Sequence, residues 1–347
     1  MNSDLQLIRL KFTSPLHLHG HSLDYSESHH RIHSDTLYAA IMQMWHLLGN
    51  QRTLDAINTG HLDWAISSLF PYVNGETGDK IYFLPRLRKM FDPDGVNRQF
   101  KHNKKLLKKI EWLDLGYFAE HVSKIGGASP MAGHIRHGKF LSKSDFGEFL
   151  TASIDPHARI PREETNGAKT TPYFTERLRF AENSGMYFLF SGDEKAFSDV
   201  QKALNLLQDE GIGSDRTLGN GRFLFEIATE EEIKPFQALF EESSEYSTNL
   251  SLFLPESKDQ LASMMRETAD DQPSRIAYEL KKRGGWITTE PFLTLQKQAV
   301  FMFSEGSIFK NSLGIAGNAV SVSPKMNLEN VPKVTRIGKS LFVPIKF

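Results

Sequence analysis

Residues 211–221 read Gly211-Ile212-Gly213-Ser214-Asp215-Arg216-Thr217-Leu218-Gly219-Asn220-Gly221 and place four glycines in one loop. Glycine tolerates positive φ and a close approach of other chain atoms, so we expect backbone N–H groups here to meet phosphate oxygens. Arg216 and Arg222 would add positive charge to such a contact. The alternative is a plain connection between two elements, but the length of the loop and its four glycines favour phosphate contact.

Two well-known phosphate-binding motifs are excluded by the surroundings of this loop. A dinucleotide-binding loop follows a strand and opens a helix, and a Walker loop ends in Gly-Lys-Ser or Gly-Lys-Thr. This loop instead follows a predicted amphipathic helix, Lys195 to Leu207, and opens a predicted strand, Arg222 to Ile227.

The N-terminal part supplies the elements that would pack beside the loop. Alternating apolar residues predict a strand over Leu5 to Phe12, and 3.6-residue periodicity predicts a helix over Thr36 to Leu48. Ser34 suits the N-cap of this helix, and Asp35 suits its positive end. A second helix is predicted over Leu54 to Phe70.

Further along, two strands are predicted at Tyr173 to Phe180 and Met186 to Phe190, joined as a hairpin through Asn183-Ser184-Gly185. The first part then reads strand, helix, insertion, strand, strand, helix, strand. This is the ferredoxin-like order with a large insertion ahead of its hairpin.

The second half repeats the opening of the first without a visible sequence repeat. Leu250 to Leu254 is strand-like, Lys258 to Thr268 is helical, and a β-rich stretch runs from Gly284 to Phe303. Residues 226–245 hold seven acids and one base, which indicates a surface near a domain border.

Composition narrows the class of protein. The 347 residues are 39% hydrophobic and 24% charged, which is typical of a globular protein. With 41 Lys and Arg against 42 Asp and Glu, a uniformly basic surface is excluded, although basic residues can still gather on one side. The chain has no cysteine, which excludes disulfides, zinc ribbons and thiol nucleophiles. Without a long apolar run or a signal-peptide pattern, we expect a cytoplasmic protein that does not enter a membrane.

A histidine-rich loop follows the first strand and leaves three interpretations open. It contains His17, His19, Gly20, His21, His29, His30 and His33. The first three histidines would share one face of an extended chain, which could hold a metal. A neutral histidine could also act as general base in RNA cleavage. A polar, hydrogen-bonding loop is the interpretation that the residues favour, since no carboxylate spacing completes a metal set.

One more basic motif precedes the predicted hairpin. Arg159-Ile160-Pro161-Arg162 could clamp a phosphate or stack on a base. No nucleophile elbow, His-Glu-x-x-His, Walker or kinase motif occurs, so the residues give little support to an enzyme.

Several of these segments together resemble the RAMP superfamily and, within it, the family of the fourth Csm subunit of type III-A CRISPR effector complexes. The glycine loop marks RAMPs in general, and the His-Ser-Asp-Thr-Leu helix start and the Glu-Gly-Ser motif narrow the resemblance to this family. The segments that carry it are Leu10 to Leu18, Ile32 to Leu37, Ala158 to Arg162, residues 211–223 and Phe303 to Phe309.

The resemblance implies an α+β fold with two ferredoxin-like (RRM-like) domains. The first would span residues 1–230, with a thumb-like insertion over about residues 85–170, and the second residues 231–347. It also implies a non-catalytic subunit that binds the 5′ handle of the CRISPR RNA, without a metal or cofactor. Its expected protein partners are the large palm-domain subunit and a backbone RAMP subunit, and target RNA would be met only indirectly.

The resemblance also implies which residues face the RNA. The glycine loop with its two arginines should lie against the handle, with the helix start beside it and the insertion approaching from the other side. The expected RNA-binding residues are His19, Gly20, Ser34, Asp35, Arg159, Arg162, Gly211, Gly213, Arg216, Gly219, Gly221, Arg222, Ser307 and Lys310.

Two rival hypotheses remain from the residues. One is a metal-independent RAMP endoribonuclease that matures CRISPR RNA, with His33 or a loop histidine as general acid or base. The other is a metal-dependent enzyme built on the histidine cluster. Cleavage of repeat RNA in EDTA would favour the first, and bound metal would favour the second.

Overall fold

Helices and runs of strands are interspersed along the chain in an α+β arrangement. The structure is a computed structural model that describes residues 4–18, 31–58, 62–89, 104–125, 132–159, 171–267, 274–287, 291–310, 314–325 and 333–347. The helices are α1 (Ser34–Leu47), α2 (Gln51–Asn58), α3 (Lys104–Lys109), α4 (Leu115–Ser123), α5 (Glu194–Glu210), α6 (Glu230–Glu241) and α7 (Lys258–Met264). No helix among these residues is long and apolar enough to cross a membrane.

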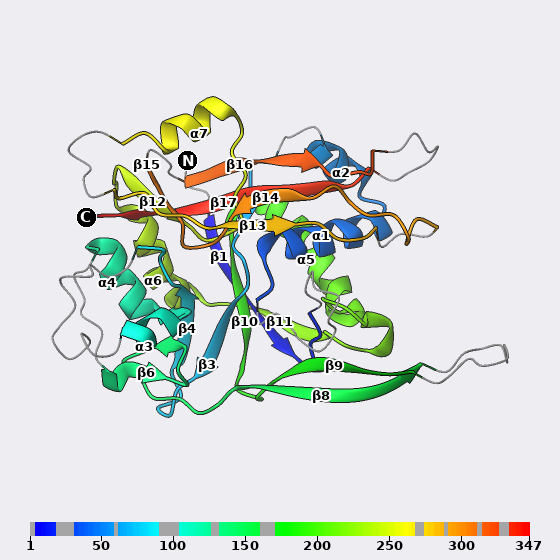
Figure 1. The fold of residues 1–347 in the computed structure, drawn as a ribbon, viewed down its shortest axis with the longest axis horizontal. Coiled ribbons are helices and arrows are strands. Elements are labelled where there is room, and N and C mark those ends of the chain that lie inside the picture. The colour runs from blue at the N-terminus through cyan, green and yellow to red at the C-terminus, as the bar shows by residue number, and fades with distance from the viewer. Residues whose placement is uncertain are drawn as a thin grey trace.

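Most strands belong to one large sheet, and the others form three smaller ones (Figure 1). The large sheet contains β1 (Asp4–Phe12), β2 (Ala65–Ile66), β3 (Phe70–Asn74), β4 (Lys80–Pro85), β5 (Trp112–Asp114), β6 (Ile135–Arg136), β7 (Phe140–Leu141), β10 (Ser184–Gly192) and β11 (Phe223–Ile227). The smaller sheets contain β8 (Leu150–Arg159), β9 (Thr171–Phe180), β12 (Tyr246–Asn249), β13 (Leu280–Arg283), β14 (Val300–Phe303), β15 (Ile308–Lys310), β16 (Gly314–Ser321) and β17 (Thr335–Ile345).

The centre of the large sheet follows the order β11-β1-β10-β3, with β4, β5, β7 and β6 added beyond β3. Helix α1 lies between β1 and β3 in the chain, and α5 lies between β10 and β11. Counting β1, β3, β10 and β11 as first to fourth, the spatial order is fourth, first, third, second. The glycine loop therefore leads into β11, which forms one edge of the sheet.

The predicted hairpin between residues 173–180 and 186–190 is wrong. β9 pairs along its whole length with β8, whereas β10 pairs with β1, β2 and β3. The insertion consequently lies between β3 and β10, not ahead of a hairpin formed by β9 and β10. A turn between successive strands favours their pairing, but here β10 is already paired along one edge with β1 and along the other with β2 and β3.

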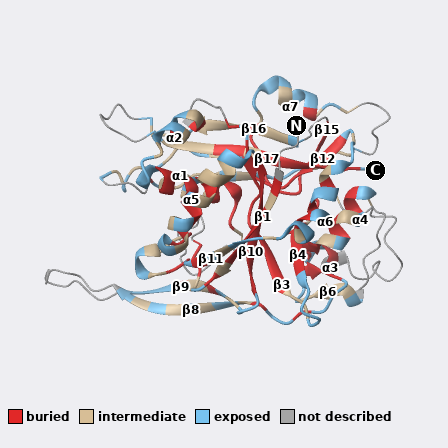
Figure 2. Ribbon diagram, turned by 180° about the vertical axis from the view of Figure 1, so that it is seen from behind, coloured by how far each residue is buried: buried red, intermediate tan, exposed pale blue. Residues whose placement is uncertain are grey.

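The central strands β1 and β10 of the large sheet are buried on both faces, whereas most of β11 at the sheet edge is exposed. Successive residues of β1 point to opposite faces: Leu7 packs with the apolar side of α6, and Ile8 and Leu10 pack with α1 and α5. Figure 2 shows the resulting band of buried residues along β1 and β10. An RRM binds RNA by stacking bases on an open sheet face, so that mode of binding is closed here.

The strands β8 and β9 form a separate ribbon that extends away from the rest of the molecule (Figure 1). Ten residue pairs hold it together, from Leu150 opposite Phe180 to Arg159 opposite Thr171. An isolated bridge between Leu16 and Leu178 attaches its base to the segment that follows β1. β8 lies within the thumb-like insertion predicted over about residues 85–170, whereas β9 begins at Thr171, just after its predicted end.

The sheet of the second half differs from the expected ferredoxin-like order. Its strands lie as β15-β12-β17-β16, which along the chain is second, first, fourth, third. The chain between β12 and β15 forms α7 and the separate β13–β14 ribbon. β16 and β17 pair directly over eight positions, and the described residues between them contain no helix. The second connecting helix of a ferredoxin-like unit is therefore not found in the part of this half that the structure describes.

Two other predicted elements are also wrong. The helix predicted over Leu54 to Phe70 ends at Asn58, and β2 and β3 follow it, because a short buried apolar run has no periodicity that separates a strand from a helix. Leu250 to Leu254 is buried but is not a strand. Its N–H groups bond to several elements: Leu250 to Leu341, Leu252 to Ser34 and Leu254 to Gly338.

Helix α6 joins the two halves of the chain. The border predicted between residues 230 and 231 falls in its first turn. Its Phe236 lies in one apolar cluster with Tyr187 of the large sheet and with Val343 and Ile345 of β17. The two halves therefore share a hydrophobic core.

Candidate nucleic-acid interface

The glycine loop folds back against the segment that follows β1. The N–H of Ser214 donates to the carbonyl of His17 at 2.8 Å, and the N–H of Gly221 donates to the carbonyl of Pro15 at 2.7 Å. Other N–H groups of the loop are also used within the protein, so only part of the loop backbone is left for the predicted contact with phosphate. The N–H donors with partners in the protein are those of Gly211, Ile212, Ser214, Leu218, Gly219, Gly221 and Arg222.

Close packing explains two of the glycines. At Gly221, φ is +75°, and a Cβ atom would lie 2.0 Å from the carbonyl oxygen of Ile212. At Gly213, φ is +100°, and a Cβ atom would lie 2.5 Å from the carbonyl oxygen of His17. These glycines let the loop close on itself and on the preceding segment, so that it forms a fixed wall.

A cavity of about 610 Å³ opens beside this wall. Helix α1 presents two alanines and several polar side chains to it, and the second half of the chain closes its far side. The described residues that line it are Leu18, Arg31, Ile32, His33, Thr36, Ala39, Ala40, Met42, Gln43, His46, Gln51, Leu54, Gly211, Ile212, Gly213, Ser214, Arg216, Arg283, Ile287, Lys297, Lys333, Val334 and Thr335.

The charge in this cavity is of one sign. No carboxylate is among its described lining residues, whereas five cationic side chains are: Arg31, Arg216, Arg283, Lys297 and Lys333. A concave surface with charge of one sign concentrates ions of the opposite sign. The cavity therefore suits a polyanion such as the backbone of a nucleic acid.

The two arginines that the first half contributes to the cavity, Arg31 and Arg216, are held in different ways. The Nη2 of Arg216 donates to Oε1 of Gln43 in α1 at 3.2 Å, which positions its guanidinium at the cavity wall. Arg31 lies 4.3 Å from the centre of the Trp112 ring and pairs with Glu111 at 3.3 Å. Arg222 has an exposed side chain and is outside the cavity lining.

Asp35 is buried, which corrects the prediction that it lies against RNA. Its carboxylate accepts from Nε of Arg283 at 2.9 Å and also pairs with Arg336 of β17. Burial pushes the pKa of Asp35 upward, but these two guanidinium groups more than offset this and hold the pKa below its ordinary value. Asp35 therefore joins α1 to the second half of the chain.

Ser34 is also buried and is not the N-cap of α1. The N-cap is His33, whose backbone is extended and whose side chain does not cap the helix. The N–H of Ser34 donates to Oγ of Ser68 at 2.8 Å, and its own Oγ accepts from the N–H of Leu252 at 3.0 Å. Since Ser34 is fully buried and contacts Ser68 and Leu252 inside the protein, it is not accessible to a phosphate.

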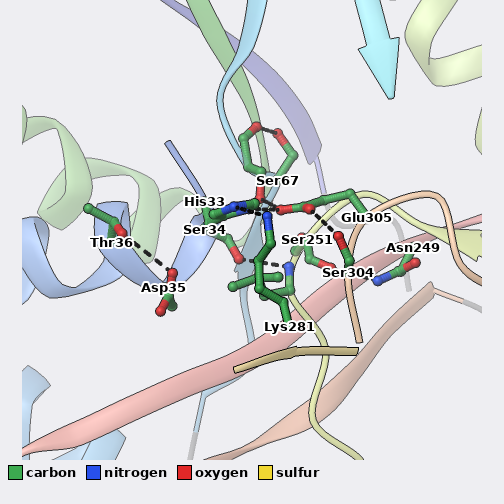
Figure 3. A network of polar contacts seen from close by, with 12 residues as sticks. His33, Ser34, Asp35, Thr36, Ser67, Asn249, Ser251, Lys281, Ser304 and Glu305 are labelled. Carbon is green, nitrogen blue, oxygen red and sulfur yellow. Dashed lines mark hydrogen bonds and ion pairs between the residues drawn. The ribbon is translucent and has the colours of Figure 1, made fainter. Parts of the chain in front are cut away.

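His33 and Glu305 form a buried pair between the halves (Figure 3). His33 Nδ1 lies 2.7 Å from Oε1 of Glu305, and His33 Nε2 lies 3.0 Å from Nζ of Lys281. An ammonium group can only donate, so Nε2 accepts and Nδ1–H donates to the carboxylate. Ser68 and Ser304 also donate to this carboxylate. Both ring nitrogens of His33 are thus engaged, and a role as general base is not supported.

Ser307 and Lys310 are buried as well, which corrects their prediction as RNA contacts. Oγ of Ser307 donates to the carbonyl of Ser304 at 2.6 Å and accepts from the N–H of Glu279 at 3.4 Å. Nζ of Lys310 pairs with Glu245 at 2.9 Å. The Glu-Gly-Ser motif therefore stabilises the second half and its contact with the first.

The remaining predicted residues lie at or beyond the edge of the described chain. Arg159 is the last residue of β8, and its side chain is not described; His19, Gly20 and Arg162 lie outside the described residues. Of the histidine cluster, His21, His29 and His30 are also outside them, while Nδ1 of His17 lies 2.8 Å from the carbonyl oxygen of Glu176.

The structure adds candidate RNA-binding residues that the sequence analysis missed. Lys297, Lys333, Arg31 and Gln43 line the cavity, and none of them lies in a recognisable motif. On the β8–β9 ribbon, Ile154 and Phe174 are 61% and 51% exposed. Alternation of apolar and polar residues could have indicated the exposed pair, but the cavity residues come together only through the fold.

Comparison with known proteins identifies the family. The model of the RAMP superfamily matches residues 9–224, more than half of the chain, and the model of the CRISPR Csm4 C-terminal domain matches residues 242–345. The chain belongs to the RAMP superfamily, as a subunit of the Csm4 type. The first match spans the glycine loop and the wall formed by α1, and the second spans the cationic wall of the second half.

Curated relatives of this RAMP subunit include two archaeal proteins called CRISPR system Cms protein Csm4. The protein from Thermococcus onnurineus is 28% identical over 294 residues, covering 81% of this chain and 82% of its own length. The protein from Methanocaldococcus jannaschii is 28% identical over 209 residues, covering 59% of this chain and 52% of its own length.

Solved structures share the fold of this RAMP subunit. A chain in the crystal structure of a Csm3–Csm4 subcomplex of the type III-A CRISPR–Cas interference complex matches with a TM-score of 0.65 at 19% identity, covering 99% of this chain and all of that one. A chain in a Csm1–Csm4 cassette in complex with cA4 matches with a TM-score of 0.56 at 20% identity, covering 99% and 98%. At this identity the likeness concerns the fold.

Proposed function

We propose that this chain is the non-catalytic subunit of a type III-A CRISPR effector complex that anchors the 5′ handle of the CRISPR RNA. The observation that carries the proposal is the cavity between the glycine loop, α1 and the second half. Its described charged lining is entirely cationic, and it lies in a chain of the RAMP superfamily. Handle phosphates would bind to the arginines and lysines of this cavity.

The fold supports a binding role for the cavity. In the described residues both faces of the central strands β1 and β10 are covered, and the cavity beside the sheet edge offers RNA a concave cationic surface. The β8–β9 ribbon projects from the same chain and carries exposed Ile154, Tyr173 and Phe174. We propose that this ribbon is the thumb and packs against the guide.

The protein partners follow from the relatives. Solved structures with this fold are of Csm4 assembled with Csm3 and with Csm1. We propose that this chain likewise bridges the large palm-domain subunit and a backbone RAMP subunit. We also propose that residues 1–230 are a ferredoxin-like domain with its insertion between β3 and β10, and residues 231–347 a second domain.

The test is binding of the purified full chain to labelled CRISPR RNA with and without its 5′ handle, in EDTA. We expect handle-dependent binding without cleavage. Arg216→Ala should weaken it by about tenfold or more, since it removes a charged hydrogen-bond donor from the cavity wall. The affinity should fall steeply with salt through counterion release.

The matched control is Lys202→Ala, which removes one positive charge from the exposed side of α5, outside the cavity lining. It should bind the handle as the unchanged protein does. Equal losses in both variants would show only non-specific attraction and would refute the site. Cleavage in EDTA would instead support the endoribonuclease hypothesis.

A further inference from the structure

Asp35 is surrounded by more positive charge than it can balance. Arg283 and Arg336 both pair with it, and Lys297 lies close enough for the fields of Asp35 and Arg336 to act on it. Among the described residues, three cations thus stand against one carboxylate in a largely buried cluster. Buried charge without a counter-ion is costly, so such a cluster suits a further anion.

Lys297 is the member of this cluster that is left for that anion. Within the part of the chain that the structure describes, its ammonium group has no hydrogen bond or ion pair, and the side chain lines the cavity. Its backbone is fixed, because its N–H donates to the carbonyl of Gly285 at 2.8 Å and the next residue, Gln298, bonds to Val322. Burial, reinforced by Arg336, lowers the pKa of Lys297 below its ordinary value, as expected of an ammonium group that has lost water without gaining a partner.

The position of Lys297 complements that of Arg216. Arg216 stands on the glycine-loop wall in the first half, and Lys297 stands on the wall that the second half contributes. Arg283 is engaged by Asp35 and Arg31 by Glu111, so their charges are already partly balanced. A phosphate backbone that passes through the cavity would meet one such cation on each wall.

We propose that Lys297 binds a backbone phosphate of the RNA held in this cavity, so that the RNA is gripped by both halves of the chain. This inference rests on the proposed function and adds the second half to the RNA site. A single ammonium group acts as a point charge, so it recognises the phosphate and not the base.

The first test compares Lys297→Gln with Lys282→Gln in the full chain, with handle RNA as the probe. Lys282 lies on β13 and is exposed opposite Phe301, outside the cavity lining, so it controls for the loss of one charge. Lys297→Gln should weaken binding by about tenfold to a hundredfold. It should also lower the slope of log affinity against log salt by about one, as expected for one lost phosphate contact. Lys282→Gln should change neither.

The second test locates the phosphate. Handle RNAs with one neutral methylphosphonate at each successive position are titrated against the unchanged chain and against Lys297→Gln. The unchanged chain should lose affinity at several positions. At one of these positions the loss of affinity should disappear in the variant. Removing either the lysine or the phosphate charge already breaks their contact, so removing both should cost no more than removing one.

The outcomes separate this inference from the proposed function. If Arg216→Ala weakens handle binding while Lys297→Gln binds with unchanged affinity and salt slope, the cavity binds RNA and Lys297 does not contribute. If the variant loses affinity but every methylphosphonate effect persists, Lys297 acts on folding and not on a phosphate, and the inference is wrong. If the unchanged chain has no preference for handle RNA, the proposed function fails and this inference fails with it.

Discussion

At the scale of single residues, the buried carboxylate of Glu305 has the largest predicted effect on stability. It is fully buried and receives hydrogen bonds from His33, Ser68 and Ser304, while Lys281 lies behind the histidine. Glu305→Gln removes the negative charge that balances Lys281 across the neutral imidazole of His33, and removing one of two opposite buried charges typically costs about 3–5 kcal/mol. Urea unfolding should show a loss of that order.

Glu279→Gln is the matched control, because this carboxylate is half exposed and pairs with Arg88 on the surface of the same region. Glu279→Gln should lower the unfolding free energy by at most about 1 kcal/mol.

The pH dependence of stability provides a second test of Glu305. Burial raises the pKa of Glu305, but His33 and Ser68 outweigh it and lower the pKa below its ordinary value. Its stabilisation is therefore present above the pKa of an unfolded glutamate, about 4.3, and is lost as the pH falls below it. The Gln variant should lose less stability than the unchanged protein between about pH 5 and pH 3; an equal loss would contradict the assignment.

The residues of the proposed RNA site show what sequence can and cannot predict at this scale. Gly211, Gly213 and Arg216 are recognisable because glycine and arginine have conformational and chemical roles that hold in any context. The role of Asp35 is not recognisable, because its partner Arg283 lies 248 positions away in the sequence. The helix start resembles an anion-binding site, but the fold buries Asp35 in an ion pair. Lys297 lies in no motif and is found only through the cavity that it lines.

At the scale of elements, the glycine loop can be tested with two glycines of similar backbone geometry. Gly221 and Gly219 both have positive φ, +75° and +82°. An alanine Cβ at Gly219 meets nothing within 4 Å, so Gly219→Ala should cost only the backbone strain, about 1–2 kcal/mol. At Gly221 the Cβ would meet the carbonyl of Ile212, so Gly221→Ala should cost more and should also weaken handle binding.

Thermal unfolding and handle binding of the two variants give the comparison. Gly219→Ala should keep near-normal affinity, because the loop retains its shape against residues 14–18. If both variants lost the same stability and affinity, the fit of the loop against Ile212 would not be what the glycines provide.

Elements with a distinct periodicity are predicted well, and those defined by their neighbours are not. β1 and α5 agree closely with the sequence prediction, since each carries its own apolar pattern. β9 is predicted as a strand but with the wrong partner, because strand pairing depends on the insertion that supplies β8. The run from residue 65 to 74 is buried on all sides, and its strands therefore lack the alternation that would identify them.

At the scale of the whole molecule, the two halves behave as one folded body. Phe236, Val343 and Ile345 share an apolar cluster with the large sheet, and the buried ion pair of Asp35 with Arg283 and the buried hydrogen bond of His33 to Glu305 cross the same boundary. The sequence predicts two domains, each with its own strands and helices. It does not show that the second half buries the face of the sheet that an independent RRM would expose, because that depends on contacts between residues more than 200 positions apart.

This shared core predicts that the halves unfold together. Buried Trp45, Trp64 and Trp112 report on the first half through their change in fluorescence on unfolding, since the fourth tryptophan, Trp286, is already 53% exposed, and amide exchange in β17 reports on the second half. In the unchanged chain both probes should give one midpoint, as expected of a single cooperative transition. Asp35→Asn leaves two guanidinium groups without their carboxylate, so the unfolding free energy should fall by about 3 kcal/mol or more. Both midpoints should fall together. Asp155→Asn, which breaks a pair with Arg177 on the β8–β9 ribbon alone, should leave both nearly unchanged. Separate midpoints, or an Asp35→Asn variant in which only the second half melts early, would mean that the halves are independent domains that merely touch.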